Sequence, residues 1–240
     1  MAIGPRKLSE NLQRVRETIA AAAAKARRAP DAVRLVAVTK TADLEDIKSL
    51  IELGLIDLGE SRVQQFLPRA AEIAAWLARR RKETPPVTWH MIGHLQRNKV
   101  RHVLEAASVI HSIDTLRLAE DINVRAAAAE RPVSVLLQVN CSGEARKSGV
   151  AVGATSCLAE QIATLSHVRL IGLMTMAPLT DNPEDARPTF VRLREIFEDM
   201  RAEGLGGKDF QHLSMGMSQD YAVAVEEGAT LLRIGSAIFS

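Results

Sequence analysis

The stretch "RLVAVTK" (34–40) is a short apolar run that ends on a single lysine. Similar runs recur along the chain, and amphipathic segments with helical spacing lie between them. Eight runs are predicted to be strands, at residues 34–39, 55–59, 87–93, 108–114, 134–140, 169–176, 210–216 and 230–239. Strict alternation of strand and helix predicts right-handed crossovers and a parallel sheet.

The number of predicted strands selects among the parallel-sheet folds. Eight strands favour a single α/β domain over residues 1–240, a (β/α)8 barrel of the TIM type, with a doubly wound open sheet as the alternative. The sequence ends soon after the eighth run, which leaves no room for a long eighth helix. Leu8, Leu12, Val15 and Ile19 have helical spacing, so we expect an extra N-terminal helix to fill that gap.

Composition narrows the class of protein. Of the 240 residues, 47% are hydrophobic and 25% charged, and the formal net charge of +2 does not indicate a nucleic-acid partner. Cys141 and Cys157 are too few for a disulfide framework. No apolar run approaches the roughly 20 residues that span a bilayer, and the N-terminus lacks a signal-peptide core. We therefore expect a cytoplasmic protein that binds neither membrane nor nucleic acid.

Lys40 directly follows the first predicted strand. In a (β/α)8 barrel the active site lies at the carboxyl ends of the strands, so this position is a candidate. A lysine at a strand end is most often a solvated charge that marks the exit of the chain into water. A partly desolvated amine at the barrel mouth can instead attack a carbonyl and form a Schiff base.

Two segments near the C-terminus have the character of a phosphate site. "LSMGMS" (213–218) follows the seventh predicted strand, and "RIGS" (233–236) belongs to the eighth. Barrel enzymes often bind phosphate with the loops after these two strands. Small residues let backbone N–H groups approach an anion, and we expect Ser218 to cap the next helix so that its start faces that anion. Turn formation alone would also explain the glycines and serines.

Arg233 interrupts the last apolar run, where a buried guanidinium needs a partner to offset its desolvation. A surface ion pair with Glu226 or Glu227 would provide one. Alternatively, the cation points into the barrel mouth, toward a ring nitrogen or a carboxylate. A lysine for an aldehyde, a phosphate cradle and a cation near a ring nitrogen together describe a pyridoxal phosphate site.

The sequence resembles the pyridoxal phosphate homeostasis protein family, whose fold is like the barrel domain of alanine racemase. The resemblance follows the order of the family over nearly the whole chain. It rests on "LVAVTK" (35–40), "GESRVQQ" (59–65), "WHMIGHLQRNK" (89–99), "SID" (112–114), "LLQVNCSGEARKSG" (136–149), "GLMTM" (172–176), "LSMGMSQD" (213–220) and "LRIGSAIF" (232–239).

That resemblance implies roles for individual residues. Lys40 would hold pyridoxal 5'-phosphate as a Schiff base, and Arg233 would face the pyridine nitrogen. The phosphate would be held by Ser214, Ser218, Gly235 and Ser236, with the backbone of Met215 and Gly216. One position departs from the pattern, because Ser61 stands where the family usually has asparagine. Serine keeps a hydroxyl but lacks the reach of the amide.

The loop "CSGEARKSG" (141–149) holds two cations among small residues. One interpretation of this loop is a mobile lid in which Arg146 and Lys147 attract phosphate, and by resemblance Lys147 would assist cofactor transfer. A flexible solvated loop is the alternative. Cys141 is expected to be an inert thiol rather than a redox sensor.

The stretch "HMIGHLQRNKVRH" (90–102) suggests two other functions, and neither is favoured. His90 and His94 are four residues apart, but the glutamate of a zinc-protease motif is absent and Gly93 interrupts the element, so no metal site is expected. The basic residues that follow lack the interleaved aromatic residues of a nucleic-acid surface.

An enzyme that uses pyridoxal phosphate needs a general acid or base beside the substrate α-carbon. Racemases that look like this one take a tyrosine from a second domain of the partner subunit, whereas Tyr221 follows the phosphate segment here. We therefore expect a non-catalytic carrier in vitamin B6 homeostasis, a monomer or weak dimer that buffers the cofactor and delivers it to apo enzymes. The alternatives are a racemase-like enzyme and a cofactor-free Schiff-base aldolase.

Overall fold

The computed structural model describes residues 2–80, 85–144 and 148–240. Eight of the described strands lie at the predicted apolar runs, and one two-residue strand at residues 150–151 was not predicted. The described strands are mostly buried. They comprise β1 (Arg34–Val38), β2 (Asp57–Glu60), β3 (Thr88–Met91), β4 (Val109–Ile113), β5 (Val133–Asn140), β6 (Val150–Ala151), β7 (Val168–Met174), β8 (His212–Ser214) and β9 (Leu231–Ile234).

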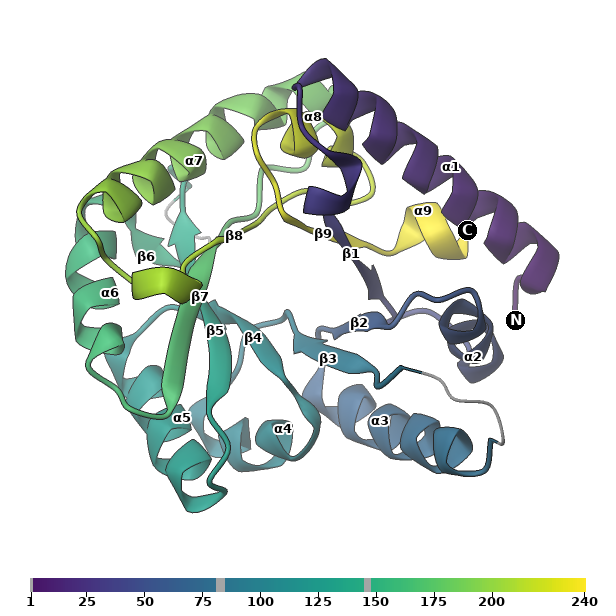
Figure 1. Ribbon diagram of the computed structural model, residues 1–240, viewed down its shortest axis with the longest axis horizontal. Coiled ribbons are helices and arrows are strands. Elements are labelled where there is room, and N and C mark those ends of the chain that lie inside the picture. The colour runs from purple at the N-terminus through teal and green to yellow at the C-terminus, as the bar shows by residue number, and fades with distance from the viewer. Residues whose placement is uncertain (1, 81–84, 145–147) are drawn as a thin grey trace.

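The described strands form a closed parallel barrel with helices around its outside (Figure 1). The order round the barrel is β1-β2-β3-β4-β5-β7-β8-β9, and β9 pairs again with β1. Pairing of β4 with β5 closes the ring, and the two-residue β6 is added beside the end of β5. This closure confirms the predicted (β/α)8 barrel and rules out the doubly wound open sheet, which would have two free edges.

Helices cover the outer face of the barrel. The α-helices are α1 (Pro5–Lys25), α2 (Leu44–Glu52), α3 (Val63–Ala78), α4 (Val100–Ala106), α5 (Leu116–Ala128), α6 (Thr155–Ala163), α7 (Arg187–Ala202), α8 (Tyr221–Glu226) and α9 (Ser236–Phe239). Short 3-10 turns are η1 (Pro30–Ala32), η2 (Arg97–Lys99), η3 (Val152–Ala154), η4 (Pro183–Ala186) and η5 (Gly207–Asp209). Among the described helices, none is both long and apolar enough to cross a bilayer.

The N-terminal helix α1 fills the gap that the short last helix leaves. It packs against α2, α8 and α9 and buries the predicted apolar face, with Leu8, Leu12, Val15 and Ile19 at most 5% exposed. Asn11 Nδ2 donates to the carbonyl oxygens of Ile238 (3.0 Å) and Ser240 (2.8 Å), so the two ends of the described chain are joined (Figure 1). The expected extra N-terminal helix is therefore confirmed, and it covers the barrel beside the short last helix.

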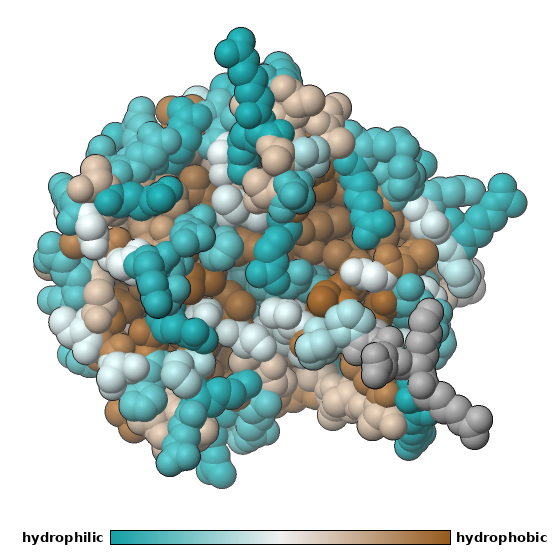
Figure 2. Space-filling view, in the orientation of Figure 1, coloured by the Kyte–Doolittle hydropathy of each residue, from teal (hydrophilic) through white to brown (hydrophobic). Residues whose placement is uncertain are grey.

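The two faces of β1 pack differently. Leu35 and Ala37 of β1 belong to the large apolar core between barrel and helices, whereas Val36 belongs to a small apolar cluster of its own. Arg233 is the register partner of Val36 and therefore shares its face, toward the interior. Figure 2 shows hydrophobic residues between the helices and toward the barrel centre, with hydrophilic residues over much of the rim.

One predicted boundary is wrong. The run at residues 230–239 was expected to be one strand, but β9 ends at Ile234 and Ser236–Phe239 forms the short helix α9. The backbone bends at Gly235, which has φ −117° and ψ −79°. An unbroken apolar run fits a buried strand and a buried helix equally well, so periodicity could not locate this change.

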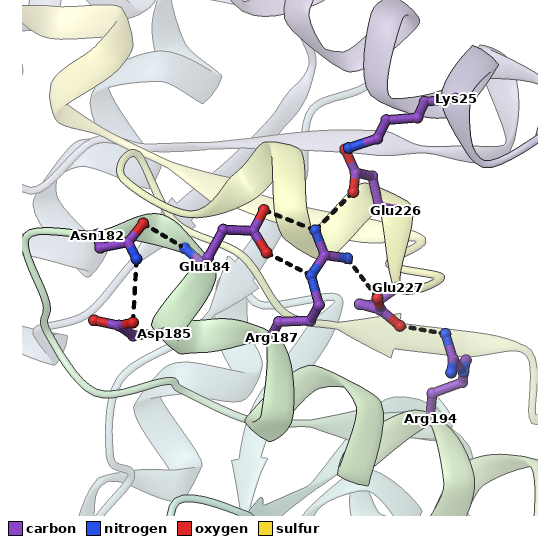
Figure 3. Close-up of polar contacts among 8 residues, drawn as sticks. All are labelled: Lys25, Asn182, Glu184, Asp185, Arg187, Arg194, Glu226 and Glu227. Carbon is purple, nitrogen blue, oxygen red and sulfur yellow. Dashed lines mark hydrogen bonds and ion pairs between the residues drawn. The ribbon is translucent and has the colours of Figure 1, made fainter.

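A cluster of ion pairs joins α1, η4, α7 and α8 on the outside of the barrel (Figure 3). Arg187 bonds to Glu184 (2.6 Å), Glu226 (2.7 Å) and Glu227 (2.6 Å). Lys25 also pairs with Glu226, and Arg194 with Glu227. These partners account for both glutamates that the sequence offered to Arg233.

Candidate ligand site at the barrel mouth

A cavity of about 470 Å³ opens at the carboxyl ends of the barrel strands. Its walls come from the ends of β1, β2, β3, β5, β7, β8 and β9 and the segments that follow them, so the cavity lies where barrel active sites lie. Five of the residues that were predicted to bind the cofactor line it together: Lys40, Ser218, Arg233, Gly235 and Ser236. Residues from distant parts of the sequence thus meet in one cavity.

Lys40 leaves β1 at the cavity, and its side chain is exposed. Within the described residues it has no hydrogen bond or ion pair, so its amine is available to a ligand. The backbone around it is held firmly. Arg69 donates to the carbonyl oxygens of Thr39 and Ala42, and the Thr39 hydroxyl donates to Glu60 Oε1 at 2.5 Å. Arg69 also bonds to Glu60 Oε1, so one buried ion pair fixes both sides of Lys40.

Sequence reasoning missed Arg69 entirely. It lies within α3, more than one turn past the matched stretch at residues 59–65, and nothing in its own surroundings singles it out. Glu60 belongs to that stretch, and a buried glutamate at the end of a strand was a signal that a cation should lie nearby.

Ser218 belongs to the segment after β8 and contacts the start of α9. Its Oγ accepts hydrogen bonds from the backbone N–H groups of Gly235 and Ala237, both at 3.2 Å. The expectation that Ser218 caps the helix after it is wrong. That helix, α8, begins only at Tyr221, and Asp220 precedes it with its carboxylate accepting from Met217 N at 2.6 Å.

The start of α9 forms a tight cradle. A Cβ at Gly235 would lie 3.3 Å from the carbonyl oxygen of Val38, so a larger residue would press on β1. Ser218, Gly235 and Ser236 therefore present two hydroxyls and a close backbone to the cavity. Small residues with N–H and O–H donors are the groups that bind a phosphate.

Arg233 lies in the cavity wall with only 4% of its surface exposed. Its Nη1 donates to Ser214 Oγ at 2.6 Å and its Nη2 to the carbonyl oxygen of Thr175 at 2.8 Å. Burial lowers the pKa of this guanidinium to about 10, so it remains a cation at neutral pH. Arg233 therefore points into the barrel, and the alternative of a surface pair with Glu226 or Glu227 is wrong.

Three of the predicted phosphate ligands do not line the cavity. Ser214 is fully buried, and its hydroxyl contacts Arg233 and His111 Nδ1 at 2.8 Å. The Met215 N–H donates to the carbonyl oxygen of Leu231. Gly216 has φ +94°, and a Cβ there would lie 2.6 Å from that of Ala224. Packing and backbone conformation thus account for these residues, and their predicted contact with a phosphate is not supported by their placement.

A chain of buried polar side chains continues behind Ser214. His111 Nε2 lies 2.9 Å from His90 Nδ1, and His90 Nε2 lies 3.1 Å from Asp57 Oδ1. Asp57 also accepts from Arg34 at 2.5 Å. Burial lowers the pKa of both histidines, most strongly that of His111. Sequence reasoning considered His90 only as a metal ligand, and the described residues contain no cluster that could hold a metal ion.

Ser61 and His94, from the loops after β2 and β3, also line the cavity. These loops lie very close together, because a Cβ at Gly93 would be only 2.1 Å from the carbonyl oxygen of Ser61. Ser61 thus borders the cavity from the position where the family usually has asparagine. Of the loop after β5, Ser148 lines the cavity, while the predicted roles of Arg146 and Lys147 fall outside the described residues.

Comparison with known proteins identifies the family to which this chain belongs. The model of the alanine racemase N-terminal domain matches residues 7–240. The pyridoxal phosphate homeostasis protein of Aquifex aeolicus is 39% identical over 230 residues, which is 96% of either chain. That of Pseudomonas aeruginosa is 39% identical over 232 residues, covering 97% of this chain and 94% of the relative. The chain belongs to the pyridoxal phosphate homeostasis protein family.

Solved structures agree with this membership. A protein of Bifidobacterium adolescentis has a TM-score of 0.91 and 37% identity, covering 98% of this chain and 95% of that one. PipY of Synechococcus elongatus, with pyridoxal phosphate bound, has a TM-score of 0.78 and 31% identity, covering 92% and 100% of the two chains. An alanine racemase of Clostridium difficile, 14% identical with a TM-score of 0.71, shares the fold over 97% of this chain and 56% of its own.

Proposed function

We propose that this member of the family binds pyridoxal 5'-phosphate at the barrel mouth and serves vitamin B6 homeostasis by buffering or delivering it. One observation carries the proposal. The Lys40 side chain, the Arg233 guanidinium and the small residues Ser218, Gly235 and Ser236 line a single cavity. The family relatives named for pyridoxal phosphate homeostasis and the bound cofactor in PipY support the same ligand.

The residues present fit the chemistry of that ligand. When bound, the cofactor supplies an aldehyde that condenses with amines, a pyridine nitrogen and a phosphate. Lys40 would hold the aldehyde carbon through its amine, and Arg233 would donate a hydrogen bond to the ring nitrogen. Ser218, Gly235 and Ser236 would hold the phosphate. A cavity of about 470 Å³ falls within the usual size of small-molecule sites.

A donor cation at the ring nitrogen also bears on catalysis. Arg233 keeps its proton at neutral pH, so it would hold the ring nitrogen as a hydrogen-bond acceptor and weaken the ring as an electron sink. Among the described residues, Tyr221 starts α8 and does not line the cavity, so it is not placed to exchange a proton there. We therefore propose a carrier that holds the cofactor without turning over an amino acid, and that passes it to apo enzymes.

Absorbance spectroscopy tests the binding. Adding pyridoxal phosphate to the purified protein should produce a visible band that Lys40→Ala abolishes. Lys48→Ala is the matched control, because Lys48 lies on α2 and pairs with Glu45 at 2.6 Å outside the cavity. Borohydride reduction followed by peptide mass spectrometry should place the cofactor on Lys40. A protein that stays colourless with added cofactor would refute the proposal.

Two further measurements separate carrier from catalyst. The loaded protein should restore activity to an apo enzyme even when a phosphatase removes free cofactor from solution. It should also fail to exchange the α-proton of amino acids in deuterated water. Sustained exchange that is lost in Lys40→Ala would instead establish a racemase-like enzyme.

A further inference from the structure

A line of hydrogen bonds runs through the barrel from its amino end to the cavity. Asp57 stands at the start of β2, beside Arg34 at the start of β1, and Arg233 lines the cavity. Between them lie His90, His111 and Ser214, each 1% exposed or less. Strands β4 and β8 are not neighbours in the sheet, so the contact between His111 and Ser214 crosses the barrel interior.

Chemistry assigns one direction to this line. A guanidinium only donates, so Arg233 donates to Ser214 Oγ. Ser214 keeps its own proton, which it can donate to His111 Nδ1, its other partner. In that direction His111 carries its proton on Nε2 and donates it to His90 Nδ1, and His90 donates from Nε2 to Asp57.

The Asp57 end of the line fixes this direction. The Asp57 carboxylate only accepts, so His90 must carry a proton on Nε2. A neutral His90 then has only an acceptor at Nδ1, which requires His111 to donate. A neutral His111 in turn has only an acceptor at Nδ1, so Ser214 donates to it, and both imidazoles carry their proton on Nε2.

The charged groups of the line lie at its two ends. Arg233 and Arg34 supply the cations and Asp57 the anion, while burial and the neighbouring cations keep the histidines neutral. His212 and Asp220 are the other titratable groups whose fields reach these residues. Aligned hydrogen bonds in a low-dielectric interior polarise one another, so Asp57 strengthens the acceptor that Ser214 offers to Arg233.

We propose that Ser214, His111, His90 and Asp57 are positioning residues, a directed relay that orients the Arg233 guanidinium toward the ligand. With Ser214 on Nη1 and the Thr175 carbonyl on Nη2, the plane of the guanidinium is defined, and its remaining N–H groups are left for the cavity. The direction of the relay stands on the structure alone. Its effect on the ligand rests on the proposed function.

Nuclear magnetic resonance of the cofactor-free protein tests the direction. With histidine labelled at both ring nitrogens, His90 and His111 should both be neutral with the proton on Nε2 throughout pH 6 to 8. Their signals are assigned from the spectra of His90→Asn and His111→Asn. A proton on Nδ1, or a charged ring in this range, in either residue would overturn the relay whether or not the protein binds cofactor.

Variants test the positioning. Ser214→Ala removes the acceptor for Arg233, and Asp57→Asn keeps the shape of the last residue while removing its charge. Each should weaken the binding of pyridoxal phosphate, about tenfold for Ser214→Ala, because a hydrogen bond to a charged group is lost. Each should also speed hydrogen exchange at the Arg233 side chain in the cofactor-free protein. The control is His102→Asn, since His102 is exposed, pairs with Glu105 outside the relay and should change neither readout.

The outcomes are distinguishable. If Ser214→Ala fails to fold, the Asp57→Asn variant still tests the positioning, and the tautomers of His90 and His111 still test the direction of the relay. Unchanged binding and unchanged Arg233 exchange in variants that fold would make the line merely structural and refute positioning. If the wild-type protein binds no cofactor, the proposed function fails. The tautomers of His90 and His111 and the hydrogen exchange of Arg233, both measured without cofactor, still test the relay.

Discussion

Arg69 on α3 contacts the completely buried carboxylate of Glu60 at the end of β2, at 2.5 Å. The same guanidinium binds the carbonyl oxygens of Thr39 and Ala42, on either side of Lys40. The side chain of Lys40, the residue predicted to react, is thus exposed and unpaired within the described chain. The backbone on either side of it is held by the ion pair between Arg69 and Glu60.

Removing this ion pair should destabilise the protein. Arg69→Ala leaves the Glu60 charge buried without its cation, which costs roughly 3 kcal/mol in the free energy of unfolding. Urea unfolding followed by circular dichroism measures this. Arg62→Ala is the control, because Arg62 is exposed just before α3 and should change the free energy by less than about 0.5 kcal/mol. Equal effects of the two substitutions would contradict the role of the pair.

The ion-pair cluster of Figure 3 makes a second prediction. Arg187 binds three glutamates from η4 and α8 with 28% of its side chain exposed, whereas Arg192 and Glu195 form a pair that is about half exposed. Arg187→Ala should therefore lower the free energy of unfolding by about 1–2 kcal/mol and Arg192→Ala by less than about 0.5 kcal/mol. Thermal unfolding at low and high salt checks both values. A loss for Arg192→Ala as large as that for Arg187→Ala would contradict the network.

Stability should fall as the pH drops below about 6.5, the ordinary pKa of histidine. Burial lowers the pKa of His90, His111 and His212, so below that pH the unfolded chain binds protons that the folded chain does not. Each such histidine adds a slope of about 1.4 kcal/mol per pH unit until its folded pKa is reached. Urea unfolding between pH 5 and 7.5 should show the decline, with a smaller slope in His111→Asn. A flat profile would show that the rings titrate in the folded protein as they do in the unfolded chain, and would contradict the lowered pKa values.

The two cysteines should differ in reactivity. Burial raises the pKa of Cys141 to about 11, so at pH 8 it is almost entirely a thiol, whereas Cys157 is exposed. Iodoacetamide at pH 8 should modify Cys157 first, and in Cys157→Ser the remaining Cys141 should react appreciably only as the pH approaches 11. Rapid labelling of Cys141 at pH 8 would contradict its placement and the expectation of an inert thiol.

Much of the architecture followed from local sequence. Apolar runs of strand length located the strands, and their alternation with amphipathic segments predicted a parallel barrel, because each strand must bury its sides against a helix or a neighbour. The position of Lys40 after the first strand likewise put it at the carboxyl end. Local pattern failed at Ser218 and after Ile234, where small and apolar residues are compatible with a turn, a strand or a helix.

The remaining features of the site depend on contacts that form only when the barrel closes. Sequence by itself determined the order of elements, the segments that reach the barrel mouth and the lysine among them, since these depend on periodicity and chain order. Tertiary structure alone decided that Ser214 faces Arg233 rather than the cavity, that Arg69 fastens the backbone around Lys40, and that His90 and His111 meet inside the barrel. Such contacts join residues on strands and helices far apart in the chain, and no local spacing records which side chains meet across a closed interior.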